Sequence, residues 1–236
     1  FVASLNMGAG QFCTNPGLVI AEKGEALDAF IAKAGEALKQ SASQTMLTPG
    51  IFDAYQQGVG LLSNHDKVRE VARGQVGEMP NQCQPVLFVT AAADFLKHDE
   101  LQDEVFGSSS LVIECNDIVE VKQVAEHLEG QLTATLQMDD ADLNAAHQLL
   151  PTLERKAGRI LVNGWPTGVE VCHAMVHGGP YPATSDSRTT SVGSAAIFRF
   201  LRPVCYQALP EELLPEALKK TNPLNIRRLL RGERED

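Results

Sequence analysis

The pattern of apolar positions predicts five short strands before residue 164. Most are nearly continuous apolar runs, which is typical of strands buried on both faces of a sheet, whereas the fourth alternates between polar and apolar residues. The five runs are Leu18–Ile20, Gln84–Thr90, Leu111–Cys115, Gln131–Gln137 and Arg159–Asn163.

Between these runs, apolar residues recur three or four positions apart, a spacing that predicts amphipathic helices. Residues 1–12 are small and mildly apolar and are expected to form a helix that ends at a turn around Cys13. Asp117, followed three positions later by Glu120, is a pair typical of a helix start. Pro151 is expected to kink or end the last helix. The helical segments are 26–40, 51–62, 118–128 and 139–150.

Strands that alternate with helices through residues 85–163 predict an α/β fold, with a mainly parallel twisted sheet and helices on both faces. Binding sites in such sheets gather at the carboxyl ends of the strands. Residues 164–196 are rich in Gly, Pro, Ser and Thr, and a loop of this length is more often functional than idle. Residues 196–206 predict a further strand. We therefore separate a domain at 1–195 from a strand and tail at 196–236.

Composition narrows the class of partner. A chain of 236 residues is long enough for one large domain, and its net charge of −10 argues against nucleic acid or an anionic membrane surface. No apolar run approaches the roughly 20 residues of a membrane span. The five cysteines are odd in number and widely spaced, which does not indicate a disulfide framework and favours a reducing, cytoplasmic setting.

No metal site is predicted from the spacing of the six histidines. His173 and His177 lie four positions apart, as on one helix face, but the Gly178-Gly179-Pro180 sequence excludes a helix there.

The strongest chemical signal is Cys13, which lies in a glycine-rich turn, Gly8-Ala9-Gly10-Gln11-Phe12-Cys13-Thr14. Small neighbours leave a sulfur accessible, and free backbone N–H groups in such a turn favour the thiolate, which is the nucleophilic form. The alternative is a buried thiol that acts only as a small hydrophobe. Local chemistry alone leaves both interpretations open.

Several motifs, in order along nearly the whole chain, extend this signal. Gly10-Gln11-Phe12-Cys13-Thr14 resembles the nucleophile motif of the aldehyde dehydrogenase superfamily, and Glu104-Val105-Phe106-Gly107 resembles its cofactor-contacting motif. Segments 158–164, 166–170, 177–184 and 185–193 resemble later motifs. Their sequences are similar to the motifs of one branch of the superfamily. That branch contains 2-oxoglutarate semialdehyde (2,5-dioxopentanoate) dehydrogenases and NADP-dependent fatty aldehyde dehydrogenases.

The resemblance implies an NAD(P)-dependent oxidation of an aldehyde to a carboxylic acid. Cys13 would form a thiohemiacetal and then a thioester, Glu104 would accept hydrogen bonds from the nicotinamide ribose, and Phe106 would lie against the nicotinamide. The implied substrate is 2-oxoglutarate semialdehyde, oxidised to 2-oxoglutarate, with a fatty aldehyde as the alternative. It also implies a homo-oligomer, a dimer or a tetramer, in which residues 196–206 cross to a partner's sheet.

Two further residues are candidates for the substrate pocket. Asn163 ends a strand where a loop begins, and its alternative is a side chain that only shapes the turn. Arg188 is able to pair with a substrate carboxylate, although we favour a role in tying its own loop to backbone carbonyls. Ser108 follows Phe106-Gly107 where common members of the superfamily have proline, and a looser loop is expected.

Some expected parts of such an enzyme have no counterpart in this sequence. The superfamily's general-base Glu and its Gly-rich phosphate-binding turn have no matching position, so we expect a fragment that lacks the cofactor domain and is inactive alone. Two other classes remain open: a thiol hydrolase or acyltransferase that pairs Cys13 with a histidine such as His177, and a non-catalytic structural fragment.

Overall fold

The structure, a computed structural model, describes residues 1–235 and divides them into two compact units, with the second beginning at Phe200. The first unit holds the main sheet. Its strand order is β1-β6-β5-β3, formed by β1 (Leu18–Glu22), β3 (Arg69–Arg73), β5 (Val86–Ala91) and β6 (Ser109–Cys115). Strands β1, β6 and β5 are parallel, and β3 is antiparallel to β5. The predicted mainly parallel sheet is therefore confirmed.

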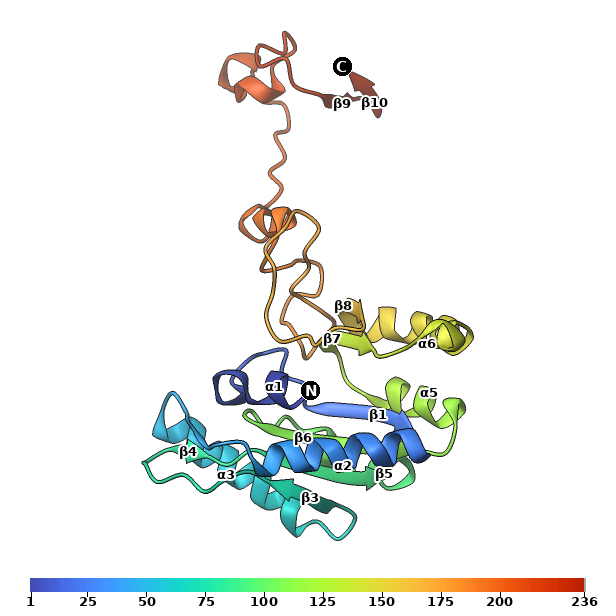
Figure 1. Cartoon of the computed structure of the whole chain (residues 1–236). Coiled ribbons are helices and arrows are strands. Elements are labelled where there is room, and N and C mark those ends of the chain that lie inside the picture. The colour runs from blue at the N-terminus through green and yellow to red at the C-terminus, as the bar shows by residue number, and fades with distance from the viewer. Residues whose placement is uncertain (236) are drawn as a thin grey trace. The chain divides into compact units, whose positions relative to one another are not determined.

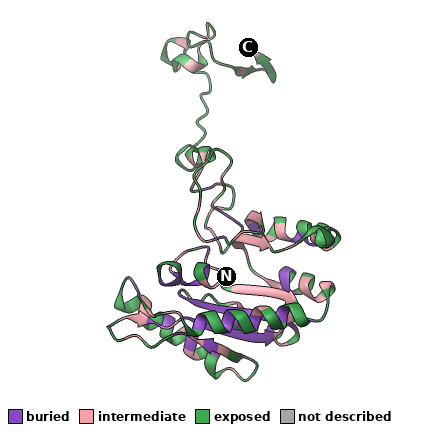
Figure 2. Cartoon of the chain, in the orientation of Figure 1, coloured by how far each residue is buried: buried purple, intermediate pink, exposed green. Residues whose placement is uncertain are grey.

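Different helices cover the two faces of this sheet (Figure 1). Successive residues of β5 point to opposite faces, as in any strand. Val86 and Phe88 share a buried core with α3 (Pro49–Asn64) and α5 (Ile118–His127), whereas Leu87 and Val89 share one with α2 (Glu25–Lys39). Figure 2 shows this buried layer in purple. The fully apolar pattern of β5 is thus explained by two separate cores.

Two helix starts follow from their capping residues. Thr48 Oγ1 accepts a hydrogen bond from Ile51 N–H at 3.2 Å, and Pro49 occupies the first turn of α3. Asp117 Oδ1 accepts from Glu120 N–H at 2.9 Å and caps α5, as predicted. The Glu120 carboxylate reaches back one residue further than in a capping box, to the N–H of Asn116.

Pro151 does not end the helix that contains it, so this part of the prediction is wrong, while a kink at Pro151 stays a prediction. Helix α6 runs from Leu143 to Lys156 through Pro151. The residues beyond the proline are held by α5, because Thr152 Oγ1 donates to the Glu126 carboxylate at 2.8 Å and the Arg155 guanidinium pairs with the same carboxylate. These side-chain contacts offset the backbone hydrogen bond that proline cannot donate.

Strands β7 (Gln131–Leu136) and β8 (Ala157–Val162) pair in parallel as a separate two-stranded sheet. In the described chain, residues 163–193 hold neither helix nor strand. The strand predicted at 196–206 is wrong: a 3₁₀ helix, Ser194–Phe200, occupies its first half, and residues 201–206 form no strand. Among the described residues no neighbouring strand pairs with this segment, and an unpaired strand is unstable in water. Its role in oligomers stays a prediction.

The remaining elements are short. The second unit carries a hairpin of β9 and β10, and none of its described residues is buried. Within residues 1–235, no helix combines the length and apolar character needed to cross a membrane. The short elements are α1 (Val2–Asn6), η1 (Met7–Gly10), β2 (Gln44–Thr45), β4 (Gln82–Cys83), α4 (Ala92–Phe95), η2 (Asp99–Gln102), η3 (Asp140–Asp142), η5 (Glu211–Leu213), η6 (Glu216–Leu218), β9 (Arg228–Leu230) and β10 (Glu233–Glu235).

A buried tyrosine in α3 predicts how stability depends on alkaline pH. Tyr55 Oη donates to Gln84 O at 2.6 Å, with Ser108 O at 3.2 Å, and burial raises the pKa of Tyr55 well above its usual value. In the unfolded chain tyrosine ionises at about pH 10. The contribution of Tyr55 to the stability of the fold is therefore complete below that pH, and above it the contribution falls by about 1.4 kcal/mol per pH unit.

We expect Tyr55→Phe to lower the free energy of unfolding by about 1–2 kcal/mol near neutral pH, because the Gln84 carbonyl loses the hydroxyl that donates to it. The difference from the wild type should close as the pH rises above about 10, since only the wild type carries this titration. Urea unfolding of both proteins across this range measures it. A difference in unfolding free energy that stays constant above about pH 10 would show that burial does not raise the pKa of Tyr55.

Candidate active site

The turn before Cys13 has a backbone that few sequences accept. Gly8, Ala9 and Gly10 have φ values of 57°, 58° and 68°, in the left-handed region that side chains disfavour. Ala9 is held there because its N–H donates to Gln44 Oε1 at 2.9 Å and its side chain is buried. The result is an exposed Cys13 at the turn that leads into β1.

This turn lies directly against the Glu104–Gly107 segment. A Cβ atom on Gly10 would lie 2.2 Å from the carbonyl carbon of Gly107, so the two backbones approach as closely as glycine permits. Asn15 Nδ2 donates to Gly107 O at 2.9 Å and ties the two segments together. Gly107 in turn packs on Tyr55, whose ring would lie 2.3 Å from a Cβ there. Two motifs more than 90 residues apart therefore form one structural unit.

Cys13, Glu104 and Phe106 all line one cavity of about 1310 Å³ in the first unit. Cys13 precedes β1 and Gly107 precedes β6, so these residues lie at the amino ends of the parallel strands. The expectation of a site at the carboxyl ends is corrected by this placement. The turn and the loop that enter the strands, rather than those that leave them, carry the candidate chemistry.

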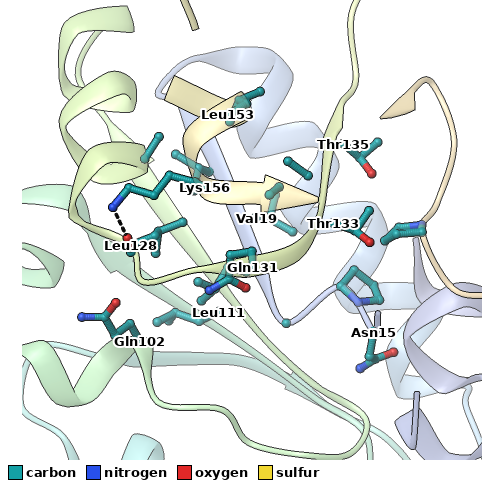
Figure 3. A pocket seen from close by; sticks show the side chains of 18 of the residues that line it. Asn15, Val19, Gln102, Leu111, Leu128, Gln131, Thr133, Thr135, Leu153 and Lys156 are labelled. Carbon is teal, nitrogen blue, oxygen red and sulfur yellow. Dashed lines mark hydrogen bonds between the residues drawn. The ribbon is translucent and has the colours of Figure 1, made fainter. Parts of the chain in front are cut away.

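The wall of this cavity is largely apolar. Figure 3 shows Val19, Leu111 and Leu128 near the two-stranded sheet of β7 and β8. Lys156 also lines it, and its Nζ donates to Leu128 O at 2.5 Å. Thr133 is half-buried there, and its Oγ1 atom is buried without a hydrogen-bond partner among the described residues. An apolar wall with a few polar groups is typical of small-molecule sites.

The two predicted cofactor residues are accessible. Glu104 is exposed, and Phe106 is 36% exposed; both also line a smaller cavity of about 360 Å³ with Thr48 and Ile51. The expected looseness after Phe106-Gly107 is wrong, because Ser108 is buried and its carbonyl accepts from Val86 N–H at 2.9 Å and lies 3.2 Å from Tyr55 Oη. The chain at Ser108 is therefore fixed by contacts with both β5 and α3.

Asn163 shapes a turn, which was the alternative to its predicted place in the substrate pocket. Its φ is 53°, its Oδ1 accepts from Met138 N–H at 2.8 Å, and its Nδ2 donates to Met138 O at 2.8 Å. Both ends of the amide are thus occupied by the chain that leaves β7. Asn163 is not among the residues that line the cavity.

Arg188 is 91% exposed and lies outside the cavity. Its guanidinium contacts Asp186 Oδ1 at 3.7 Å, and its own N–H donates to the same oxygen at 3.1 Å. The favoured ties to backbone carbonyls are made instead by Arg159, whose Nη2 donates to Pro166 O at 2.7 Å. The sequence did contain a signal for Arg159, because it is the one arginine within the apolar strand β8. The sequence interpretation did not use that signal.

From the sequence, His177 has no role in the dehydrogenase interpretation and is named as the partner of Cys13 in the hydrolase alternative; its Nε2 lies 3.2 Å from Cys13 Sγ. Its position is fixed by its loop: His177 N–H donates to the buried Thr190 Oγ1 at 2.8 Å, and His177 O accepts from Ser191 N–H at 3.0 Å. The signal available in the sequence was a histidine next to paired glycines in a long loop.

The cysteines divide into two groups by burial. Burial raises the pKa of the Cys83 thiol and raises that of Cys115 to about 12, so both stay protonated and unreactive near neutral pH. Cys13, Cys172 and Cys205 are exposed. Of these three, Cys13 lines the large cavity.

Comparison with solved structures shows which fold this is. Lactaldehyde dehydrogenase from Escherichia coli superposes with a TM-score of 0.69 at 19% identity, covering 85% of this chain and 42% of that one. PnpE in complex with nicotinamide adenine dinucleotide gives a TM-score of 0.67 at 18% identity, covering 83% and 40%. The fold is that of an aldehyde dehydrogenase catalytic domain. No family model matches the chain.

Two curated relatives match almost the entire chain, at 55% identity over 235 residues and 51% over 232. Both bear the name of an aldehyde-oxidising dehydrogenase, and this chain is similar in sequence to slightly less than half of each. The first is alpha-ketoglutaric semialdehyde dehydrogenase 2 from Azospirillum brasilense, and the second is alpha-ketoglutaric semialdehyde dehydrogenase from Acinetobacter baylyi. The chain spans 45% and 44% of their lengths.

Proposed function

We propose that this chain supplies the nucleophile and part of the cofactor site of an NAD(P)-dependent dehydrogenase that oxidises 2-oxoglutarate semialdehyde to 2-oxoglutarate. The observation that carries the proposal is the contact of Gly10 and Gly107, which places the Cys13 turn and the Glu104–Gly107 segment at one cavity. The names of the two relatives support the substrate. A long-chain aldehyde is the alternative substrate.

Cys13 is the reacting residue in this proposal. Its thiolate forms a bond from Sγ to the aldehyde carbon, and the electron pair of the carbonyl bond moves to oxygen. Backbone N–H groups of the turn are available to stabilise that oxyanion. The oxyanion electron pair then re-forms the carbon–oxygen double bond as the same carbon gives up hydride, for which a bound nicotinamide would be the acceptor, and a thioester remains on Cys13. Water then adds to the thioester carbon, and the carbon–sulfur bond breaks to release the acid and the thiolate.

Glu104 and Phe106 suit a nicotinamide cofactor. The exposed Phe106 ring offers an apolar surface to a planar ring, and an exposed carboxylate such as Glu104 accepts hydrogen bonds from ribose hydroxyls. The cofactor supplies hydride acceptance when it is bound. A choice between NAD and NADP does not follow from these two residues, and the enzyme is proposed to act as a homo-oligomer.

To test the proposal, this chain is fused to the part of the Azospirillum brasilense relative that has no counterpart in the chain. We expect the joined protein to reduce NAD⁺ or NADP⁺ with 2-oxoglutarate semialdehyde, and the 236-residue chain alone to be inactive. Hexanal in the same assay tests the alternative substrate. Turnover by the chain alone would refute the expectation that a cofactor domain is needed, and an inactive joined protein would refute the proposed function.

The contact of 3.2 Å between Cys13 Sγ and His177 Nε2 favours a second candidate function, a thiol hydrolase. A thiol beside an imidazole nitrogen is the arrangement in which a base removes the thiol proton. Such an enzyme would cleave thioesters without nicotinamide. The dehydrogenase remains our first proposal because both relatives bear that name.

We expect His177→Ala to slow alkylation of Cys13 by iodoacetamide by about tenfold or more near neutral pH, since proton removal by a positioned base contributes at least this much. Mass spectrometry of each cysteine measures the rate, and the exposed Cys172 in the same sample is the internal control. An unchanged rate at Cys13 would show that His177 does not activate the sulfur. Thioester cleavage without nicotinamide, lost in this variant, would favour the hydrolase.

A further inference from the structure

Three side chains that the proposed function does not use meet at the opposite end of the main sheet. His65 follows the last residue of α3, and His98 and Glu100 flank the start of η2. Thr90, near the carboxyl end of β5, donates through Oγ1 to Lys67 O at 2.9 Å and so fixes the segment after His65 beside the strand. Cys13 lies at the amino ends of the strands, so this cluster is a separate place in the fold.

The donor atoms of the cluster lie close to one another. One nitrogen or oxygen atom from each of His65, His98 and Glu100 lies within 4.8 Å of the other two. Glu100 Oε1 is 3.4 Å from His65 Nε2 and 3.4 Å from His98 Nδ1. Both distances exceed the roughly 2.7–2.9 Å of a charge-assisted hydrogen bond. They equal the edge of about 3.4 Å between two ligands of a tetrahedral zinc ion whose bonds are about 2.1 Å.

From this geometry we propose that His65, His98 and Glu100 bind a divalent transition metal ion, with Zn²⁺ as the reference ion. Two imidazoles and one carboxylate form a donor set that suits zinc and leaves a fourth position for water. The ion would connect the end of α3 to the segment between α4 and α5. Sequence spacing excluded a metal because it compares only near neighbours, whereas the fold brings together residues 33 and 35 positions apart.

The surroundings of His65 already orient its ring. Its side chain is 14% exposed, and its Nδ1 accepts from Lys67 N–H at 3.1 Å, which leaves Nε2 directed at Glu100. Metal binding through Nε2 moves the ring proton to Nδ1, at the expense of the Lys67 contact. Asp66 Oδ1, 3.8 Å from Nδ1, is the carboxylate oxygen that would then accept a hydrogen bond from the Nδ1–H group. Metal-bound histidines usually donate their second N–H in this way.

The test is Zn²⁺ titration by calorimetry, using tag-free protein whose exposed thiols have been blocked with iodoacetamide. We expect one Zn²⁺ per chain, and at least a tenfold loss of affinity in His65→Ala, His98→Ala and Glu100→Gln. Asp66→Asn should lose about tenfold through its effect on His65. His147→Ala, which removes an exposed histidine on α6, is the matched control and should bind as the wild type does.

A second measurement separates metal binding from folding. Zn²⁺ should raise the unfolding temperature of the wild type and leave that of the His65→Ala, His98→Ala double variant unchanged, because an ion that binds only the folded state stabilises it. Circular dichroism without added metal checks that the variants fold. The proposal is overturned if Zn²⁺ does not bind, or if the His65 and His98 variants bind it within twofold of the wild type. Neither outcome bears on the proposed dehydrogenase.

Discussion

Cys13→Ser is expected to lower kcat/KM for aldehyde oxidation by at least about 10³-fold in the joined protein, which carries the part of the relative that this chain does not cover. A hydroxyl group is far less acidic than a thiol and a poorer nucleophile without a strong base, so the first bond to the aldehyde carbon no longer forms at a useful rate. Formation of NADH or NADPH, followed by absorbance, measures the effect.

Cys172→Ser is the matched control for this variant. Cys172 is also exposed, but it lies outside the large cavity, and its substitution should leave kcat/KM within about twofold of the wild type. If Cys13→Ser retained more than a tenth of the activity, Cys13 would not be the nucleophile, and the proposed mechanism would fail with it.

Gly10→Ala is expected to destabilise the protein by roughly 2–5 kcal/mol. A side chain at φ +68° costs about 1–2 kcal/mol, and the added Cβ would lie 2.2 Å from the Gly107 backbone, which adds about 1–3 kcal/mol of overpacking. This is a large share of the roughly 5–15 kcal/mol that holds a typical domain folded. Urea unfolding followed by circular dichroism measures it.

Gly60→Ala provides the control in the opposite direction. Gly60 lies inside α3, and a Cβ there would meet no atom within 4 Å outside its own helix and chain neighbours. We therefore expect a gain of about 0.5–1 kcal/mol, because alanine is the better helix former. Equal effects at the two glycines would show that the contact between Gly10 and Gly107 does not hold the turn.

The main elements of the fold follow from local patterns. The apolar run that became β5 and the Asp117 cap of α5 were predicted because each depends on neighbouring residues alone. Strand β3 was missed because its sequence, Arg69-Glu70-Val71-Ala72-Arg73, is rich in charge, as an edge strand allows. The course of α6 beyond Pro151 depends on Glu126 of another helix, which no local pattern reveals.

The candidate site also contains residues that the sequence predicts and residues that only the fold reveals. Motif resemblance selected Cys13, Glu104 and Phe106, and the fold brings all three to one cavity, although their roles stay proposals. The sequence named His177 beside Cys13 in the hydrolase alternative alone, because 164 positions separate the two residues and folding of the long loop brings them together. Arg188 carried a plausible charge, but in the part of the chain that the structure describes its guanidinium pairs with Asp186, two positions earlier, and not with a group of the cavity.

The close approach of Gly10 and Gly107 also constrains evolution and engineering of this chain. Gly10 has no room for a Cβ while the Gly107 backbone stays in place, and Gly107 has none while the Tyr55 ring stays in place, so natural variants should keep both glycines. A transplant of residues 8–17 into another scaffold would retain its shape only if residues 104–109 were transferred with it. The smallest portable piece of this site is therefore discontinuous in the gene.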